Sequence, residues 1–176
     1  MKKMLLLITI CSFAFSGTLY LSADMNQELE VSKSGVSVDS DLDLGFSIGY
    51  NHPFYQKDAM ALSIGGSYNL LPMESDDLDG DGGFLNLYLL PSYAISEEVK
   101  LWAAFGLSKP THDIDDYDNG ILIGFGVSYK VNDKYSVGLG FNKNIHEADD
   151  IPYYGVLYDN VDADVSGFKF FLGYQM

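Results

Sequence analysis

The acidic run at residues 77–82 is the segment of this sequence best suited to binding a metal ion. Asp77, Asp79 and Asp81 occupy alternate positions, and Gly82 follows them. This spacing matches the start of a calcium-binding loop, in which alternate carboxylates converge on one hard cation. The twelfth position of such a loop needs a bidentate glutamate, and Tyr88 occupies it here. The sequence therefore favours weak divalent binding by a broadly acidic surface, with these three aspartates as candidate Ca²⁺ ligands and no other cofactor.

Three histidines are the only candidates for acid-base chemistry near neutral pH. His112 and His146 lie in acidic stretches, and His52 lies in a shorter connection. Acyl transfer needs a nucleophile beside a base, and no serine motif accompanies these histidines. We therefore predict no catalytic residues and expect His146 to be a solvated loop residue.

The charge balance excludes one class of partner. The formal net charge is −15, with 25 acidic residues against 10 lysines and no arginine. Such a chain would repel the phosphates of nucleic acids. We expect no nucleic-acid partner.

Residues 1–16 have the pattern of a secretory signal peptide. Lys2 and Lys3 precede an apolar stretch, and Ala14-Phe15-Ser16 forms a small-x-small cleavage site. The stretch is shorter than the roughly 20 residues of a membrane-spanning helix. Cys11, the only cysteine, falls inside it, so no disulfide is expected in the remaining domain, residues 17–176.

From residue 17 onward, apolar residues recur with a period of two, which is typical of β-strands. The runs cover residues 19–26, 41–50, 59–70, 85–93, 99–108, 121–130, 135–142 and 167–176. One face of each run is apolar and the other is small or polar. We expect Pro53 to end the second run and residues 51–57 to form a turn.

Three further patterns indicate lipid, rather than a second sheet, against the apolar faces. Short connections alternate with long ones, at residues 71–82, 109–119 and 144–161, as in membrane barrels. Tyrosines gather near the short turns, as in an aromatic girdle. Of the 25 acids, 20 lie in the long connections or on the strand ends of the same side, and the five that do not are Asp24, Asp58, Glu97, Glu98 and Asp133. The sequence therefore predicts an all-β, eight-stranded, antiparallel up-and-down transmembrane β-barrel.

The inward faces are rich in glycine, serine and alanine, which suits a small barrel filled by its own side chains. We expect inward-facing acids and lysines to pair, because an unpaired charge there would be costly. The acids are Asp24, Asp41 and Asp43, and the lysines are Lys100, Lys130 and Lys169. Trp102 is interpreted as packing rather than as a ligand platform.

These features resemble the small outer-membrane barrel family that includes outer membrane protein X and the barrel domain of outer membrane protein A. The resemblance covers the whole of residues 17–176, through residues 87–93, 101–106 and the alternating C-terminal strand. It implies the outer membrane of a Gram-negative bacterium, contact with its lipids and lipopolysaccharide, and assembly by the barrel-insertion machinery. The family usually ends in an aromatic residue; here Tyr174 and Met176 take the last apolar positions.

The leading hypothesis is a non-enzymatic, monomeric barrel with a structural role in the envelope and acidic outer loops. An adhesin acting through those loops and a narrow channel for small solutes or ions are the alternatives. Some eight-stranded barrels modify lipid A with a histidine, a serine and a carboxylate, so an enzyme of that kind is a further alternative, the least favoured.

Overall fold

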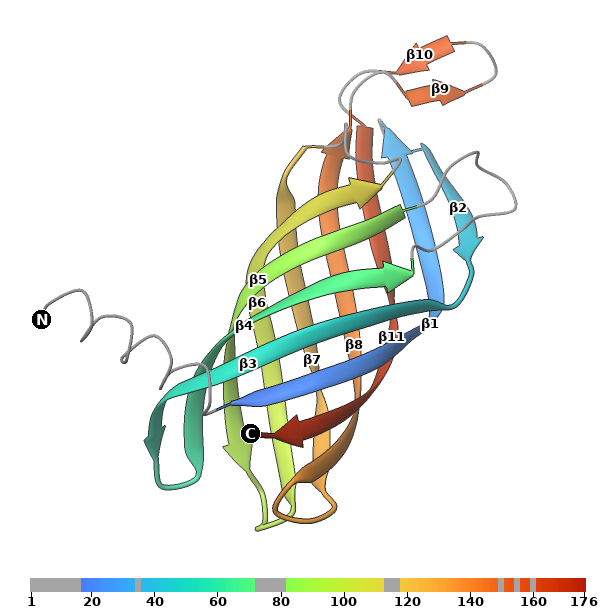
Figure 1. The fold of residues 1–176 in the computed structure, drawn as a ribbon. Helices are drawn as coiled ribbons and strands as arrows, with labels where there is room; N and C mark the ends of the chain where they lie inside the picture. Colours follow the sequence, from blue (N-terminus) through green and yellow to red (C-terminus); the bar gives the residue numbers. More distant parts are fainter. Residues whose placement is uncertain are drawn as a thin grey trace, which may run out of the picture.

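The computed structural model shows a closed antiparallel β-barrel (Figure 1). It describes residues 17–33, 36–71, 82–112, 118–148, 151–153, 156–158 and 161–176. The strands are β1 (Thr18–Lys33), β2 (Val36–Leu42), β3 (Gly45–Lys57), β4 (Met60–Leu71), β5 (Gly82–Ala94), β6 (Val99–His112), β7 (Gly120–Lys130), β8 (Tyr135–Ala148), β9 (Ile151–Tyr153), β10 (Val156–Tyr158) and β11 (Val161–Gln175). Within these residues no helix is long and apolar enough to cross a membrane.

From β3 to β8 each strand pairs with the next one in the chain; β1 pairs with β3, β8 pairs with β11, and the pairing of β11 with β1 closes the barrel. The order around the wall is β11-β8-β7-β6-β5-β4-β3-β1, with β2 as an extra strand beside β1. β9 and β10 form a separate hairpin at the end of the barrel away from the C-terminus (Figure 1). The predicted eight-stranded antiparallel barrel is confirmed, with this one added strand in its wall.

β1 is long because it serves two partners in succession. Its first half pairs with β3, up to Asp24 opposite Gly45, and its second half pairs with β2, from Gln27 opposite Leu42. The change of partner coincides with a bulge at Asn26, whose φ is 47°. Asparagine is one of the few residues that adopt this left-handed conformation readily.

This bulge, and the gap between β2 and β3, shift the inward-outward alternation by one residue. Asn26, expected to face inward, is exposed, and Leu42, expected on the outer face, packs against the interior. The prediction that Asp41 and Asp43 face inward is wrong as well, since both are exposed. A prediction from period-two alternation assumes unbroken strands, so it cannot detect a shift of one residue.

The expected turn at residues 51–57 is also wrong. β3 continues through Pro53 to Lys57, and the chain reverses at Asp58, which has a φ of 53°. A bulge between Pro53 and Tyr55 absorbs the proline. Beyond Asn51, β3 has no described partner on its β1 side, and proline is tolerated on such an edge.

Candidate functional site

The outer surface of the barrel carries a belt of exposed apolar side chains. In β7, Ile121, Ile123, Phe125, Val127 and Tyr129 are all exposed, and the residues between them point inward. The apolar stretches of β6 (99–107) and β7 (121–129) are nine residues long, and so is the stretch from residue 168 in β11 to Met176 just beyond that strand. Nine residues rising about 3.3 Å each, tilted by about 40°, give a belt about 23 Å tall. That height matches the apolar band of membrane barrels and indicates contact with lipid.

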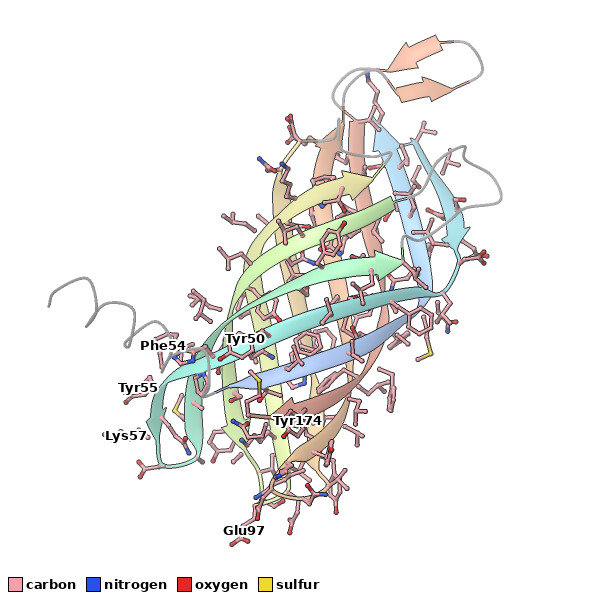
Figure 2. All side chains as sticks on the ribbon, in the orientation of Figure 1. Tyr50, Phe54, Tyr55, Lys57, Glu97 and Tyr174 are labelled. Carbon is pink, nitrogen blue, oxygen red and sulfur yellow. The ribbon has the colours of Figure 1, made fainter. Side chains whose placement is uncertain are left out.

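Tyrosines mark the short-turn end of this belt. Tyr135 and Tyr174 pair across β8 and β11, with ring centroids 5.4 Å apart. Tyr93 and Tyr129 are exposed on the same outer face. Figure 2 shows Tyr174 in the lower part of the barrel, above the turn that carries Glu97. This arrangement supports the predicted aromatic girdle.

Beyond the belt, at the opposite end, the chemistry of the two faces reverses. Glu28 and Glu30 face outward on β1, whereas Leu29 between them is buried inside. On β11, Asp164 faces outward and is bonded to Lys143 at 2.6 Å. That hydrogen bond is the main cause of the raised pKa of Lys143. Charged outward faces indicate that these strand ends lie in water rather than in lipid.

An apolar cluster fills the barrel at this level. Its buried members are Leu29, Phe84, Ala163 and Val165. Val31 and Leu42 pack against it, partly buried. We call these six residues the outer plug.

His146 belongs to the same level and is not the solvated loop residue that the sequence suggested. β8 continues to Ala148, so the imidazole points into the barrel, where it is 2% exposed. Its ring stacks on Phe84, with centroids 5.1 Å apart. Burial is the main cause of its lowered pKa.

The structure pairs His146 with a serine that the sequence analysis missed. Nε2 lies 3.1 Å from Ser108 Oγ, and Nδ1 lies 3.0 Å from the backbone carbonyl of Asp118. The carbonyl only accepts, so Nδ1 of the neutral ring donates to it. The Ser108 hydroxyl has one proton to donate, and its two acceptors are His146 Nε2 and Asn144 Oδ1, the latter at 3.0 Å. Strand spacing does not reveal such a pairing, because the three residues come from β6 and β8.

A serine beside a histidine is the arrangement of an activated nucleophile, but this one is sealed. Ser108 is 1% exposed, and Phe84 of the outer plug covers the imidazole. In the described part of the chain no carboxylate is bonded to His146; Asp118 offers only its main chain. The network therefore satisfies buried polar atoms and cross-links β6 and β8.

His52 does not join it. His52 lies in β3, where its ring stacks on Tyr50 at 6.5 Å. His112 is the last residue of β6, and its side chain lies outside the described residues.

In the middle of the barrel, an inward-facing ion pair joins two residues that lie opposite each other on the adjacent strands β1 and β11. Lys169 Nζ lies 3.4 Å from Asp24 Oδ1. Ser47 and Asn69 both donate to Asp24 Oδ2, the latter at 3.4 Å. Asn142, with its amide oxygen turned inward, accepts from Lys169 at 3.3 Å. The expected pairing of charges is confirmed for Asp24 and Lys169 alone.

The two other lysines expected in that pairing lie near the short turns. Lys130 is bonded to Asp133 at 2.7 Å, and this hydrogen bond raises the pKa of the lysine and lowers that of the aspartate. Lys100 lines a cavity of about 460 Å³ that opens between the short turns. We call this cavity the vestibule.

Aromatic side chains form the inner wall of the vestibule. Trp102 lies over Gly126 and Gly140, where any larger side chain would run into its ring, and it packs edge-on against Phe171 at 6.1 Å. Trp102 packs against Tyr88, Ala104 and Leu122, as expected, and its ring also lines the vestibule. Tyr20 and Tyr88 share a hydrogen bond of 2.7 Å, and Tyr88 donates to Asn51 at 3.0 Å.

Two sequence predictions fall on residues outside the described part of the structure. These are the candidate Ca²⁺ ligands Asp77, Asp79 and Asp81 and the signal peptide at residues 1–16. Among the described residues, no three histidine, cysteine, aspartate or glutamate side chains form a group that could hold a metal ion.

Comparisons with known proteins bear on the fold. No protein-family model matches the sequence, and no curated protein is similar to it. The crystal structure of Ail, the attachment invasion locus protein of Yersinia pestis, matches with a TM-score of 0.51 and 16% identity, over 92% of this chain and 99% of that one. Neisserial surface protein A matches with a TM-score of 0.49 and 16% identity, over 91% and 99%. The chain has the fold of the small eight-stranded outer-membrane β-barrels.

Proposed function

We propose that this protein is a non-enzymatic barrel of the Gram-negative outer membrane that contributes to the structure of the envelope surface. The observation that carries the proposal is the combination of a continuous apolar belt with an interior occupied by the Asp24–Lys169 pair and the outer plug. A belt of this height suits a bilayer. An interior occupied by such side chains suits a structural component better than a wide pore.

The proposed orientation places the short turns and the C-terminus in the periplasm. Three observations support it: the girdle tyrosines lie at that end, the exposed acids of β1, β2 and β11 lie at the other, and membrane barrels have short periplasmic turns. Residues 1–16 would direct export, and the barrel-insertion machinery would read the C-terminal strand that ends at Tyr174 and Met176. Lipids and lipopolysaccharide would surround a monomer.

Adhesion is the second candidate. Outside the belt, β1, β2 and β11 continue into water with acidic outward faces, and β9–β10 stands beyond them (Figure 1). Such strands could present a surface to a cationic partner. Ail, one of the structural matches, is named as an attachment protein. We propose attachment as the second candidate role of this chain.

Membrane insertion is tested by a charge placed in the belt. Phe125 lies at the centre of the β7 stretch and is 60% exposed. Phe125→Arg should destabilise the inserted barrel by about 2–4 kcal/mol, and Ile121→Arg, at the edge of the same stretch, by at most about 1 kcal/mol. The measurement is urea unfolding in vesicles, read by the gel mobility of unheated samples.

Wild-type protein should fractionate with the outer membrane and change mobility only on boiling. Recovery of the wild type in the soluble periplasm, or equal effects of the two arginines, would contradict the proposal. A strain lacking the gene should become more permeable to detergent. If permeability is unchanged while deletion of residues 149–160 abolishes binding to host cells, adhesion replaces the envelope role.

A further inference from the structure

We propose that the vestibule is a binding site for small aromatic organic anions, such as aryl carboxylates and sulfonates. This role is separate from the envelope function, because it concerns the interior of the barrel at its short-turn end rather than its outer surface.

The first argument is the charge around the vestibule. Lys100, Lys130 and Lys134 line it together with Glu98 and Asp133. Lys130 and Asp133 neutralise each other at 2.7 Å, which leaves Lys100 and Lys134 against Glu98 among these lining residues. Glu97 acts on Lys130 as well but does not line the vestibule. The whole chain carries −15, so a locally cationic opening departs from the rest of the molecule. Low-dielectric walls concentrate such a field inside a cleft.

Deeper in the vestibule the charges are balanced. Lys169 also lines the cavity, but it is held by Asp24 at 3.4 Å. The positive potential therefore comes from the mouth, and a bound anion would place its charged group there. Its ring would point inward.

The inner wall supplies the surface for that ring. Tyr20, Phe171 and Trp102 follow one another around the wall, with centroid separations of 6.0 and 6.1 Å. Leu90, Leu122 and Ala104 add apolar lining. A cavity of about 460 Å³ lies within the usual range of ligand pockets, which combine apolar walls with a few placed polar groups.

Trp102 makes the site directly observable, because it is the only tryptophan of the chain. We would titrate refolded protein in neutral detergent with 4-nitrobenzoate, 4-nitrobenzyl alcohol and 4-nitrobenzylammonium, and follow the quenching of tryptophan fluorescence. The three probes share one ring and differ in charge. The anion should quench saturably and bind about fivefold or more tightly than the neutral probe, with the cation weakest.

Matched variants assign the preference to the mouth. Lys100→Gln with Lys134→Gln should reduce the affinity for 4-nitrobenzoate about fivefold and leave the neutral probe unchanged. Lys109→Gln, an exposed lysine at the other end of β6, is the control and should change nothing. Heat-dependent gel mobility reports separately whether each variant is folded.

Three results overturn the proposal: quenching by the anion that does not saturate, quenching that is strongest for the cation, or equal affinities in the double variant and the wild type. None of these bears on membrane insertion, which the Phe125→Arg comparison decides.

Discussion

Loss of Lys169 should leave a buried carboxylate without its counter-charge. The Lys169 and Asp24 side chains are 11% and 7% exposed, with nitrogen and oxygen 3.4 Å apart. After Lys169→Met, Asp24 keeps only the hydrogen bonds from Ser47 and Asn69. These donors orient the carboxylate but supply no full positive charge.

The magnitude follows from the burial of the pair. Removing one partner of a buried ion pair costs about 3–5 kcal/mol, because the remaining charge is uncompensated. Replacing both charges is often close to neutral. Lys169→Met should therefore cost about 3–4 kcal/mol, and Asp24→Asn with Lys169→Met less than about 1.5 kcal/mol. The double variant keeps an oxygen for Ser47.

The assay is reversible urea unfolding in lipid vesicles, followed by Trp102 fluorescence and by the mobility of unheated samples. Lys109→Met, at an exposed position of β6, is the control and should stay within about 0.5 kcal/mol of the wild type. If Lys169→Met lowers the free energy of unfolding as little as Lys109→Met does, the ion pair does not stabilise the barrel. The same conclusion follows if the loss in the double variant equals the sum of the losses in the two single variants.

Three other predictions concern the interior and the candidate metal ligands. Gly140→Val should clash with Trp102 and destabilise the barrel by about 1–3 kcal/mol, measured from urea unfolding midpoints. Adding Trp102→Leu should recover most of that loss, and the control Gly66→Ala, whose new methyl group would meet only the Asn86 carbonyl, should change the stability little. The pKa of buried His146 is lowered from 6.5, so the folded state favours the neutral imidazole. The free energy of unfolding should therefore be highest above about pH 6.5 and fall as the pH drops below that value. The variant His146→Gln should show a weaker pH dependence, and an equally steep fall in that variant would exclude the histidine as its source. Millimolar Ca²⁺ should raise the melting temperature of the wild type but not of a chain with Asp77, Asp79 and Asp81 changed to Asn; no shift in the wild type would remove the metal site.

The sequence was sufficient to predict the barrel, because alternation in β4 to β8 and β11 is set by local residue type. Residues 121 to 129 alternate so that only one face of the strand is apolar, and the structure exposes that face. The prediction of which side chains point inward failed where that direction depends on the partner strand. The bulge at Asn26 moved Asp41 and Asp43 outward, and the bulge near Pro53 extended β3.

The interior network was predictable only in part. A lysine and an aspartate on inward faces suggested a pair, and Asp24 with Lys169 formed it. The contacts of Ser108 with His146, and of Asn69 with the Phe84 main chain at 2.9 Å, depend on the tilt and closure of the barrel. Closure of the barrel also brings Tyr20 beside Tyr88, which lies 68 residues later in the chain. The spacing of residues along the sequence does not predict that contact.

The most direct test of the membrane barrel is the accessibility of spin labels placed one at a time on β7 in lipid vesicles, at outward positions 121, 123, 125, 127 and 129 and at inward positions 122 and 128. We predict that oxygen, which concentrates in lipid, relaxes the labels at the five outward positions most strongly and that the two inward labels are shielded. Stronger relaxation by oxygen at positions 122 and 128, or a response of the outward labels to a water-soluble nickel reagent instead, would show that the outward side chains do not face lipid.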